Sequence, residues 1–215
     1  MTDIALGVRR SAWGVRVLAV VFGAALVALA AQISIPLPGT PVPMTLQPMA
    51  VLLVGGLLGA RLGASSMILY LAMGAAGLPV FTPTVPLVGV ARLLGPTGGY
   101  LLAYPVAAWA VGWLANPGQQ PTSPGPHPGP DSSVAFLDPA LPRGVSQPWL
   151  RTTLAVVTGL ALIHLGGLAQ LAILTGDISS AARFGTLPFL LGDLIKIAVL
   201  VPVLTKLAPT IRARL

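Results

Sequence analysis

The sequence contains no cysteine and no glutamate, and charged residues make up only 8% of its 215 residues. The absence of cysteine excludes disulfides, thiolate metal sites and cysteine nucleophiles. Soluble domains carry about 25% charged residues, so this composition cannot cover a water-exposed surface of ordinary size. Because 55% of the residues are hydrophobic and the mean hydropathy is +0.88, the sequence indicates an integral membrane protein embedded in a lipid bilayer.

Negative charge is scarce as well. The chain has 12 Lys and Arg residues against five acidic residues, all of them Asp, which gives a net charge of +7. On a soluble domain such an excess would suggest nucleic-acid binding. Here the cations stand at the ends of apolar segments, where they orient a membrane protein. We therefore expect no nucleic-acid partner.

Six apolar segments recur along the chain, each near the length of about 20 residues at which a helix crosses a bilayer. They cover residues 12–35, 45–60, 62–77, 98–115, 151–175 and 188–208. The first is too long for the apolar core of a signal peptide and is expected to remain as a helix. The predicted fold class is an all-α integral membrane protein, a six-transmembrane-helix bundle that forms a single membrane domain over residues 1–215.

A Pro- and Gly-rich linker at residues 116–148 separates the fourth and fifth apolar segments. Its composition predicts a mobile segment without a core of its own. With six helices, both termini and this linker lie on one side, together with most of the cations. These are Arg9, Arg10, Arg16, Arg61, Arg143, Arg151, Lys206, Arg212 and Arg214. Only Arg92 and Arg183 fall on the other side, so the positive-inside rule predicts cytoplasmic termini and a cytoplasmic linker.

Asp193 and Lys196 interrupt the last apolar segment, in its outer half. Ionisable residues within a membrane are rare and mark functional sites by default. The spacing of three residues places both side chains on one helix face. A structural ion pair that neutralises itself is the alternative, although two apolar residues would stabilise the bundle at least as well. We predict that Asp193 and Lys196 bind a ligand.

Three further polar residues lie toward the same outer side. Arg92 precedes a Gly-rich helix start and offers a planar guanidinium suited to a carboxylate; an exposed loop cation is the alternative. Thr45 and Gln47 open the second apolar segment beside a Pro-rich stretch, where their side chains can hydrogen-bond a ligand. A helix cap at Thr45 and a solvated Gln47 are the alternative.

The first apolar segment carries Ala24, Ala28 and Ala31 on one stripe. Small residues at this spacing let another helix approach closely, either within the bundle or from a partner. In the fifth segment, His164 and Gln170 are also intramembrane. For His164 a hydrogen-bonded packing role is favoured over ligand binding.

The sequence offers little for enzymatic chemistry. No nucleophile or metal site accompanies the Asp193 and Lys196 pair, and no catalytic residue, metal or cofactor is expected. The Gly-rich run at residues 95–99 lacks the Gly-Lys-Ser/Thr of a phosphate loop, so no ATP site is expected in this chain. A stand-alone secondary transporter, with Asp193 or His164 as a proton relay, is the alternative to a substrate-binding transport subunit. The internal repeats common in such carriers are not evident.

Five separated motifs occur in order from the first helix to the last. They are Gln32–Pro38, Val42–Gln47, Gly77–Phe81, Leu94–Leu101 and Gly192–Lys196. Together they resemble the BioY family, the biotin-specific S components of energy-coupling factor (ECF) vitamin transporters. The main departure from the family is the long Pro-rich linker, which lies on the side away from the expected site.

The resemblance implies an ECF S-component fold that captures biotin from outside at the plasma membrane. It implies that Arg92, Asp193 and Lys196 line the biotin site. The other expected substrate-binding residues, which lie in the matched motifs, are Thr45, Gln47 and Tyr100. Biotin is expected as the transported ligand rather than as a cofactor, and the sequence leaves open which cation pairs with its carboxylate.

The resemblance also implies partners. In the family, a transmembrane coupling protein and cytoplasmic ATPase subunits drive transport. Ala24 and Ala28 match the small-residue stripe through which the first helix contacts the coupling protein.

Overall fold

The computed structural model describes residues 2–115 and 148–215, with side chains from Trp13 onward. The elements in these ranges are α1 (Thr2–Gln32), β1 (Ser34–Ile35), β2 (Met44–Thr45), α2 (Gln47–Leu58), α3 (Ala60–Ala75), α4 (Val90–Leu94), α5 (Gly98–Leu114), α6 (Pro148–Thr175), α7 (Ile178–Gly185), the short 3₁₀ helix η2 (Leu187–Phe189) and α8 (Leu190–Arg212). The predicted linker lies outside the described residues, apart from Pro148, which is the first residue of α6.

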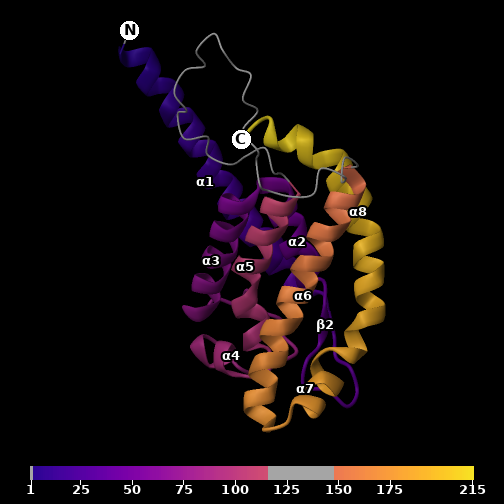
Figure 1. Cartoon of the computed structure of the whole chain (residues 1–215). Helices are drawn as coiled ribbons and strands as arrows, with labels where there is room; N and C mark the ends of the chain where they lie inside the picture. The colour runs from indigo at the N-terminus through magenta and orange to yellow at the C-terminus, as the bar shows by residue number, and fades with distance from the viewer. Residues whose placement is uncertain (1, 116–147) are drawn as a thin grey trace, which may run out of the picture.

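The long helices pack side by side as an elongated bundle around α2 (Figure 1). This helix contacts α1, α3, α5, α6 and α8. Its sequence is apolar around the whole circumference, as expected for a helix enclosed by others, and Val51 and Leu52 are fully buried. Each of the six predicted apolar segments coincides with one long helix, which confirms the all-α membrane bundle.

The six long helices differ in how well they match the thickness of a membrane. Among the described residues, three segments are long and apolar enough to cross it: Trp13–Gln32, Pro148–Thr175 and Ile178–Arg212. In contrast, α2, α3 and α5 have 12, 16 and 17 residues, below or at the short limit of the spanning range of about 17–25. Of these three, α2 is enclosed by other helices, so other parts of the chain replace lipid around it. In contrast, α3 and α5 also expose apolar side chains such as Ile68 and Leu102.

Both ends of the chain lie at one end of the bundle, where α1 begins and α8 ends (Figure 1). The side chain of Arg16 donates a hydrogen bond to the backbone oxygen of Leu215 at 3.3 Å. Arg212 likewise donates to the oxygen of Leu57, at the last turn of α2, at 3.2 Å. Arg16 and Arg212, two of the cations that the sequence assigns to one side of the membrane, therefore both lie at this terminal end.

Glycines allow the closest helix contacts. A Cβ atom at Gly99 in α5 would clash with the backbone oxygen of Gly166 in α6, and a Cβ at Gly166 would clash with that of Gly99. Gly59 alone separates α2 from α3 and has φ of +83°, a conformation that glycine adopts without steric cost. The tight hairpin between these helices is thereby formed in one residue.

The opposite end, called the far end below, carries the short elements. The strands β1 and β2 pair antiparallel, with Ser34 opposite Thr45. The helices α4 and α7 lie at the same end (Figure 1). Asp177 caps α7, because its carboxylate accepts hydrogen bonds from Ser180 N at 2.8 Å and Ser179 N at 3.2 Å. Hydrogen bonds from Ser180 and Ser179 lower the pKa of this carboxyl below its ordinary value.

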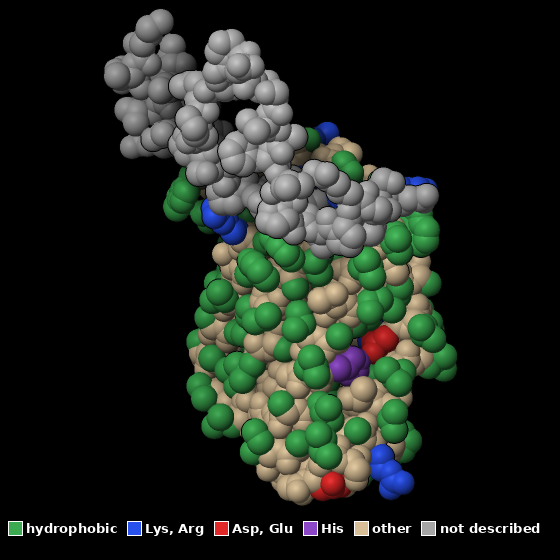
Figure 2. Space-filling view, in the orientation of Figure 1, with side chains coloured by type: hydrophobic (Ala, Val, Ile, Leu, Met, Phe, Trp, Pro, Cys, Tyr) green, Lys and Arg blue, Asp and Glu red, His purple; other side chains and the backbone are tan. Residues whose placement is uncertain are grey.

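The outer surface of the bundle is mostly apolar (Figure 2). Phe22, Leu165 and Ile173 are 67%, 60% and 82% exposed. A contiguous apolar surface of this extent is unfavourable in water and suits lipid. Figure 2 also shows a histidine and an acidic side chain next to one another within this apolar face.

Candidate functional site

One pocket near the far end contains every residue that the sequence predicted to bind substrate. These are Thr45, Gln47, Arg92, Tyr100, Asp193 and Lys196. They come from β2, α2, α4, α5 and α8, and Leu160, Ile163 and His164 of α6 close another wall. The empty volume is about 610 Å³, counting the part that is open to the surroundings. The pocket therefore brings together segments that are far apart in the sequence.

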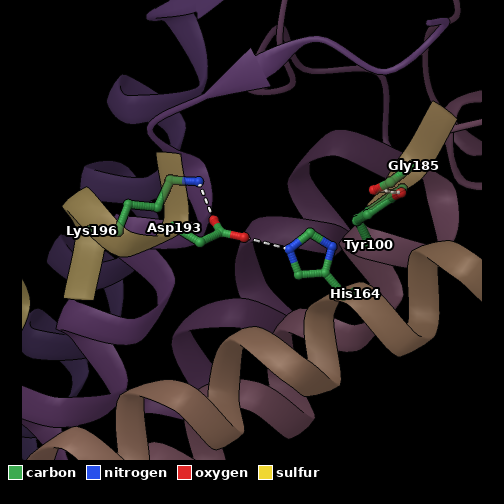
Figure 3. A network of polar contacts seen from close by, with 5 residues as sticks. All are labelled: Tyr100, His164, Gly185, Asp193 and Lys196. Atoms are coloured by element: carbon green, nitrogen blue, oxygen red, sulfur yellow. Dashed lines mark hydrogen bonds and ion pairs between the residues drawn. The ribbon is translucent and has the colours of Figure 1, made fainter. Parts of the chain in front are cut away.

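Asp193 is the centre of the polar network in this pocket (Figure 3). Its Oδ1 accepts a hydrogen bond from Lys196 Nζ at 2.7 Å, and its Oδ2 lies 2.6 Å from His164 Nε2. Asp193 and Lys196 are both buried, with side chains that are 9% exposed. The spacing along α8 thus does place the two charges on one face, as predicted.

Arg92 is almost fully buried, with 1% of its surface exposed. Its Nη1 donates to Val85 O at 2.6 Å, and its Nη2 donates to Thr82 O at 2.9 Å. Each of these oxygens belongs to a residue that precedes a proline, in a loop without regular secondary structure. The exposed loop cation considered as the alternative for Arg92 is therefore wrong. One side of its guanidinium ties down the loop, and its Nε has no hydrogen-bond partner.

Gln47 begins α2 and is buried, with 4% of its surface exposed, so the alternative of a solvated side chain is wrong. Its Nε2 donates to Tyr70 Oη at 2.5 Å, and Tyr70 in turn donates to Val80 O at 3.2 Å. Thr45 Oγ1 accepts a hydrogen bond from the backbone N of Gln47 at 3.3 Å. These bonds hold the start of α2 rigid beside the pocket.

His164 is the pocket residue that sequence reasoning ranked lowest. It reaches across from α6 to Asp193 on α8, and the rings of Tyr100 and Phe189 lie 6.3 Å and 6.4 Å from its own. Its intramembrane position was the available signal, but periodicity does not reveal the rotation of one helix relative to another. Gln170, considered together with His164, does not line the pocket; its side chain donates to Leu93 O at 3.0 Å and to Gly95 O at 2.8 Å.

Two other pocket residues come from the start of α5. Tyr100 donates from its hydroxyl to Gly185 O at 2.5 Å, which joins α5 to the end of α7. Thr97 directly precedes α5, yet its hydroxyl does not cap the helix and has no hydrogen-bond partner. Thr97 lies within the motif Leu94–Leu101, but the sequence did not predict a role for it.

The small-residue stripe of α1 lies apart from the pocket. Ala24 is 1% exposed and Ala31 is fully buried, whereas Ala28 is half-buried. The stripe therefore faces the bundle more than it faces outward. A contact between Ala24 or Ala28 and a partner stays a prediction.

The residues of this pocket are suited to binding a small molecule. Its walls are mainly apolar and aromatic, and it holds one carboxylate, two cations and several neutral hydrogen-bonding groups. Within residues 2–115 and 148–215, no group of three or more His, Cys, Asp or Glu side chains is placed to hold a metal ion. An apolar pocket with a few convergent polar groups is typical of a small-molecule binding site.

Comparison with known proteins gives consistent matches along the whole chain. A model described as the BioY family matches residues 8–213. The probable biotin transporter BioY of Pyrococcus horikoshii is 34% identical over 183 residues, which cover 85% of this chain and 90% of that protein. The biotin transporter BioY of Thermotoga maritima is 35% identical over 175 residues, which cover 81% and 85%.

A solved structure is similar as well. It is described as the crystal structure at 2.1 Å of the S-component for biotin from an ECF-type ABC transporter. The two structures superpose with a TM-score of 0.71 over 92% of each chain, at 25% sequence identity. The matched relatives are named as transporters and not as enzymes.

Proposed function

The chain belongs to the BioY family, and from that membership we propose that it captures biotin from outside the cell as the S component of an ECF transporter. The observation that carries the proposal is the convergence of six separately predicted residues on one pocket near the far end. The similarity to proteins named as biotin transporters supports the choice of ligand. Biotin is the cargo here, and no cofactor is proposed.

The chemistry of biotin matches the composition of the pocket. Its fused rings and thioether are apolar, and they suit walls formed by residues such as Leu101, Leu160 and Ile163. Its ureido group offers two N–H donors and one acceptor, and its valerate chain ends in a carboxylate.

The bound state has two negative charges, on Asp193 and on the biotin carboxylate, and two cations, Lys196 and Arg92, are available to pair with them. Lys196 already forms an ion pair with Asp193 at 2.7 Å. Arg92 has a free Nε–H donor and a planar group suited to a carboxylate. We therefore assign the biotin carboxylate to Arg92 and the neutralisation of Asp193 to Lys196.

We further propose that ECF partners, a transmembrane coupling protein and paired cytoplasmic ATPases, supply the energy. The sequence itself has no phosphate loop. Ala28, which is half-buried, is the more accessible of the two alanines proposed to contact the coupling protein. Uptake that rises when these partners are expressed with the chain supports this step, and uptake that is unchanged contradicts it.

Purified protein should bind labelled biotin saturably at one site. The measurement is equilibrium binding in detergent, with unlabelled biotin, thiamine and riboflavin as competitors. Only unlabelled biotin is expected to displace the label, because the proposed site matches a ligand carboxylate with Arg92 and a ureido group with polar side chains of the pocket. Binding of thiamine or riboflavin in place of biotin, or no binding at all, would falsify the proposed function.

The proposed site faces outward only if the termini are cytoplasmic, as the cation distribution indicates. Because the chain has no cysteine, single cysteines report topology without background. Val88→Cys, in a loop residue at the far end that is 76% exposed, should react with an impermeant thiol reagent on intact cells. Arg214→Cys, near the terminal end, should react only after permeabilisation. The reverse pattern of labelling would place the pocket on the cytoplasmic side.

A further inference from the structure

Buried polar atoms without partners gather at the pocket. Among the described residues, five buried side-chain nitrogen or oxygen atoms have no hydrogen-bond partner. Three of them belong to residues that line the pocket: Arg92 Nε, Thr97 Oγ1 and His164 Nδ1. Such atoms are rare in folded proteins, and each one calls for an explanation. A bound ligand that supplies the missing partners is one explanation for a group of them at one pocket.

The position of the proton on His164 follows from its neighbours. Asp193 forms an ion pair with Lys196, whose Nζ donates a hydrogen bond to Oδ1. An ionised carboxylate only accepts hydrogen bonds. The hydrogen in the 2.6 Å contact between His164 Nε2 and Asp193 Oδ2 therefore belongs to the imidazole. With the imidazole neutral, which the inference assumes, the other nitrogen, Nδ1, is then an acceptor.

His164 Nδ1 differs in kind from the other two unpartnered atoms. Arg92 Nε can only donate, and Thr97 Oγ1 can rotate to donate or accept. Both oxygens of Asp193 already have a donor within 2.7 Å. Figure 3 shows the second ring nitrogen of His164 directed away from Asp193. With a neutral ring, His164 Nδ1 is thus a buried acceptor without a partner, on a ring that lies near Tyr100 and Phe189.

We propose that His164 determines specificity for biotin, because its Nδ1 accepts a hydrogen bond from one ureido N–H group of the ligand. The inference rests on the proposed function, since it assumes that biotin occupies this pocket. In the bound state Asp193 fixes the tautomer of His164, and Nδ1 of His164 accepts the hydrogen bond from the ureido group. The histidine side chain is 16% exposed, so part of the ring is open to a ligand that enters beside it.

A purely positioning role is the competing explanation, in which His164 acts only by holding Asp193. Two amide variants separate the roles, because the side-chain amide of Asn lies near the position of Nδ1 and that of Gln lies near Nε2. His164→Asn keeps an acceptor for the ligand and gives up the contact with Asp193. His164→Gln keeps a donor to Asp193 and gives up the acceptor.

The test uses purified full-length protein and three probes: biotin and its two isomers methylated on one or the other ureido nitrogen. Wild type is expected to bind one isomer at least about tenfold more weakly than biotin, the loss of one hydrogen bond at a buried acceptor. His164→Asn should keep this discrimination, and His164→Gln should lose it. Leu165→Phe, a substitution at the adjacent lipid-facing residue, is the matched control and should behave as wild type.

Each outcome bears on the inference. Equal binding of biotin and both isomers by wild type would overturn it, whatever the variants do. Discrimination that survives in His164→Gln and disappears in His164→Asn would also overturn it, in favour of positioning through Asp193. Failure of wild type to bind biotin at all would instead contradict the proposed function. Thermal unfolding of each variant, with and without biotin, shows whether a loss of binding reflects a loss of fold.

Discussion

Asp193→Asn is expected to lower both the stability of the protein and its affinity for biotin. The substitution leaves the Lys196 ammonium, 9% exposed and 2.7 Å from the lost charge, without an ionic partner. Breaking a buried ion pair in this way costs about 3–5 kcal/mol of unfolding free energy. Loss of the charge-assisted hydrogen bond between Asp193 and His164 in the bound state should weaken biotin binding by about 1.5–3 kcal/mol. Thermal unfolding in detergent and equilibrium binding of labelled biotin measure the two effects separately.

The double variant Asp193→Leu with Lys196→Met distinguishes a binding pair from a structural one. It removes both charges, so most of the lost stability should return. His164 Nε2 loses its acceptor in this variant, which leaves a smaller deficit of about 1–3 kcal/mol. Biotin affinity should stay low, because the group that orients His164 and balances the site is gone. A stable double variant with the affinity of wild type would remove Asp193 and Lys196 from the binding site.

The helical bundle could be predicted from composition and the lengths of the apolar segments. Each of the six predicted segments overlaps one helix, and Gly59 alone separates the second of these helices from the third. The elements α4, α7 and η2 were missed, since five-, eight- and three-residue helices are too short to produce a periodic pattern. The cap at Asp177 was the one local signal for α7.

The members of the site could be predicted from their chemistry, but their contacts could not. Polar residues inside an apolar segment stand out in any sequence, which is how Asp193 and Lys196 were identified. The contact of His164 with Asp193 depends on how α6 and α8 are rotated about their axes, and each helix alone leaves that rotation undetermined. The side-chain contact at 2.6 Å is therefore a result of packing that the structure provides.

The contacts of Arg92 illustrate a second limit. Its guanidinium was predicted to line the ligand site, and the structure shows that its two terminal nitrogens also donate hydrogen bonds to Thr82 O and Val85 O. The loop contains Pro83 and Pro86, which have no N–H groups, and it forms no helix or strand that would pair these two oxygens. A buried carbonyl needs a donor, and Arg92 supplies it for two of them while leaving Nε unused.

Arg92→Ala is therefore expected to have two effects on binding, which can be told apart by comparing biotin with biotin amide. Loss of the bonds to the loop should loosen one wall of the pocket and weaken biotin and biotin amide alike. Loss of the Nε–H donor should weaken biotin by a further 1.5–3 kcal/mol, about 10- to 150-fold, because only biotin carries a carboxylate charge. Equilibrium binding of both ligands measures the difference. Arg183→Ala, which removes an exposed cation at the same end, is the control and should leave both affinities unchanged. If Arg92→Ala weakens the two ligands equally while Lys196→Ala weakens biotin selectively, the carboxylate pairs with Lys196, and Arg92 serves only to hold the loop.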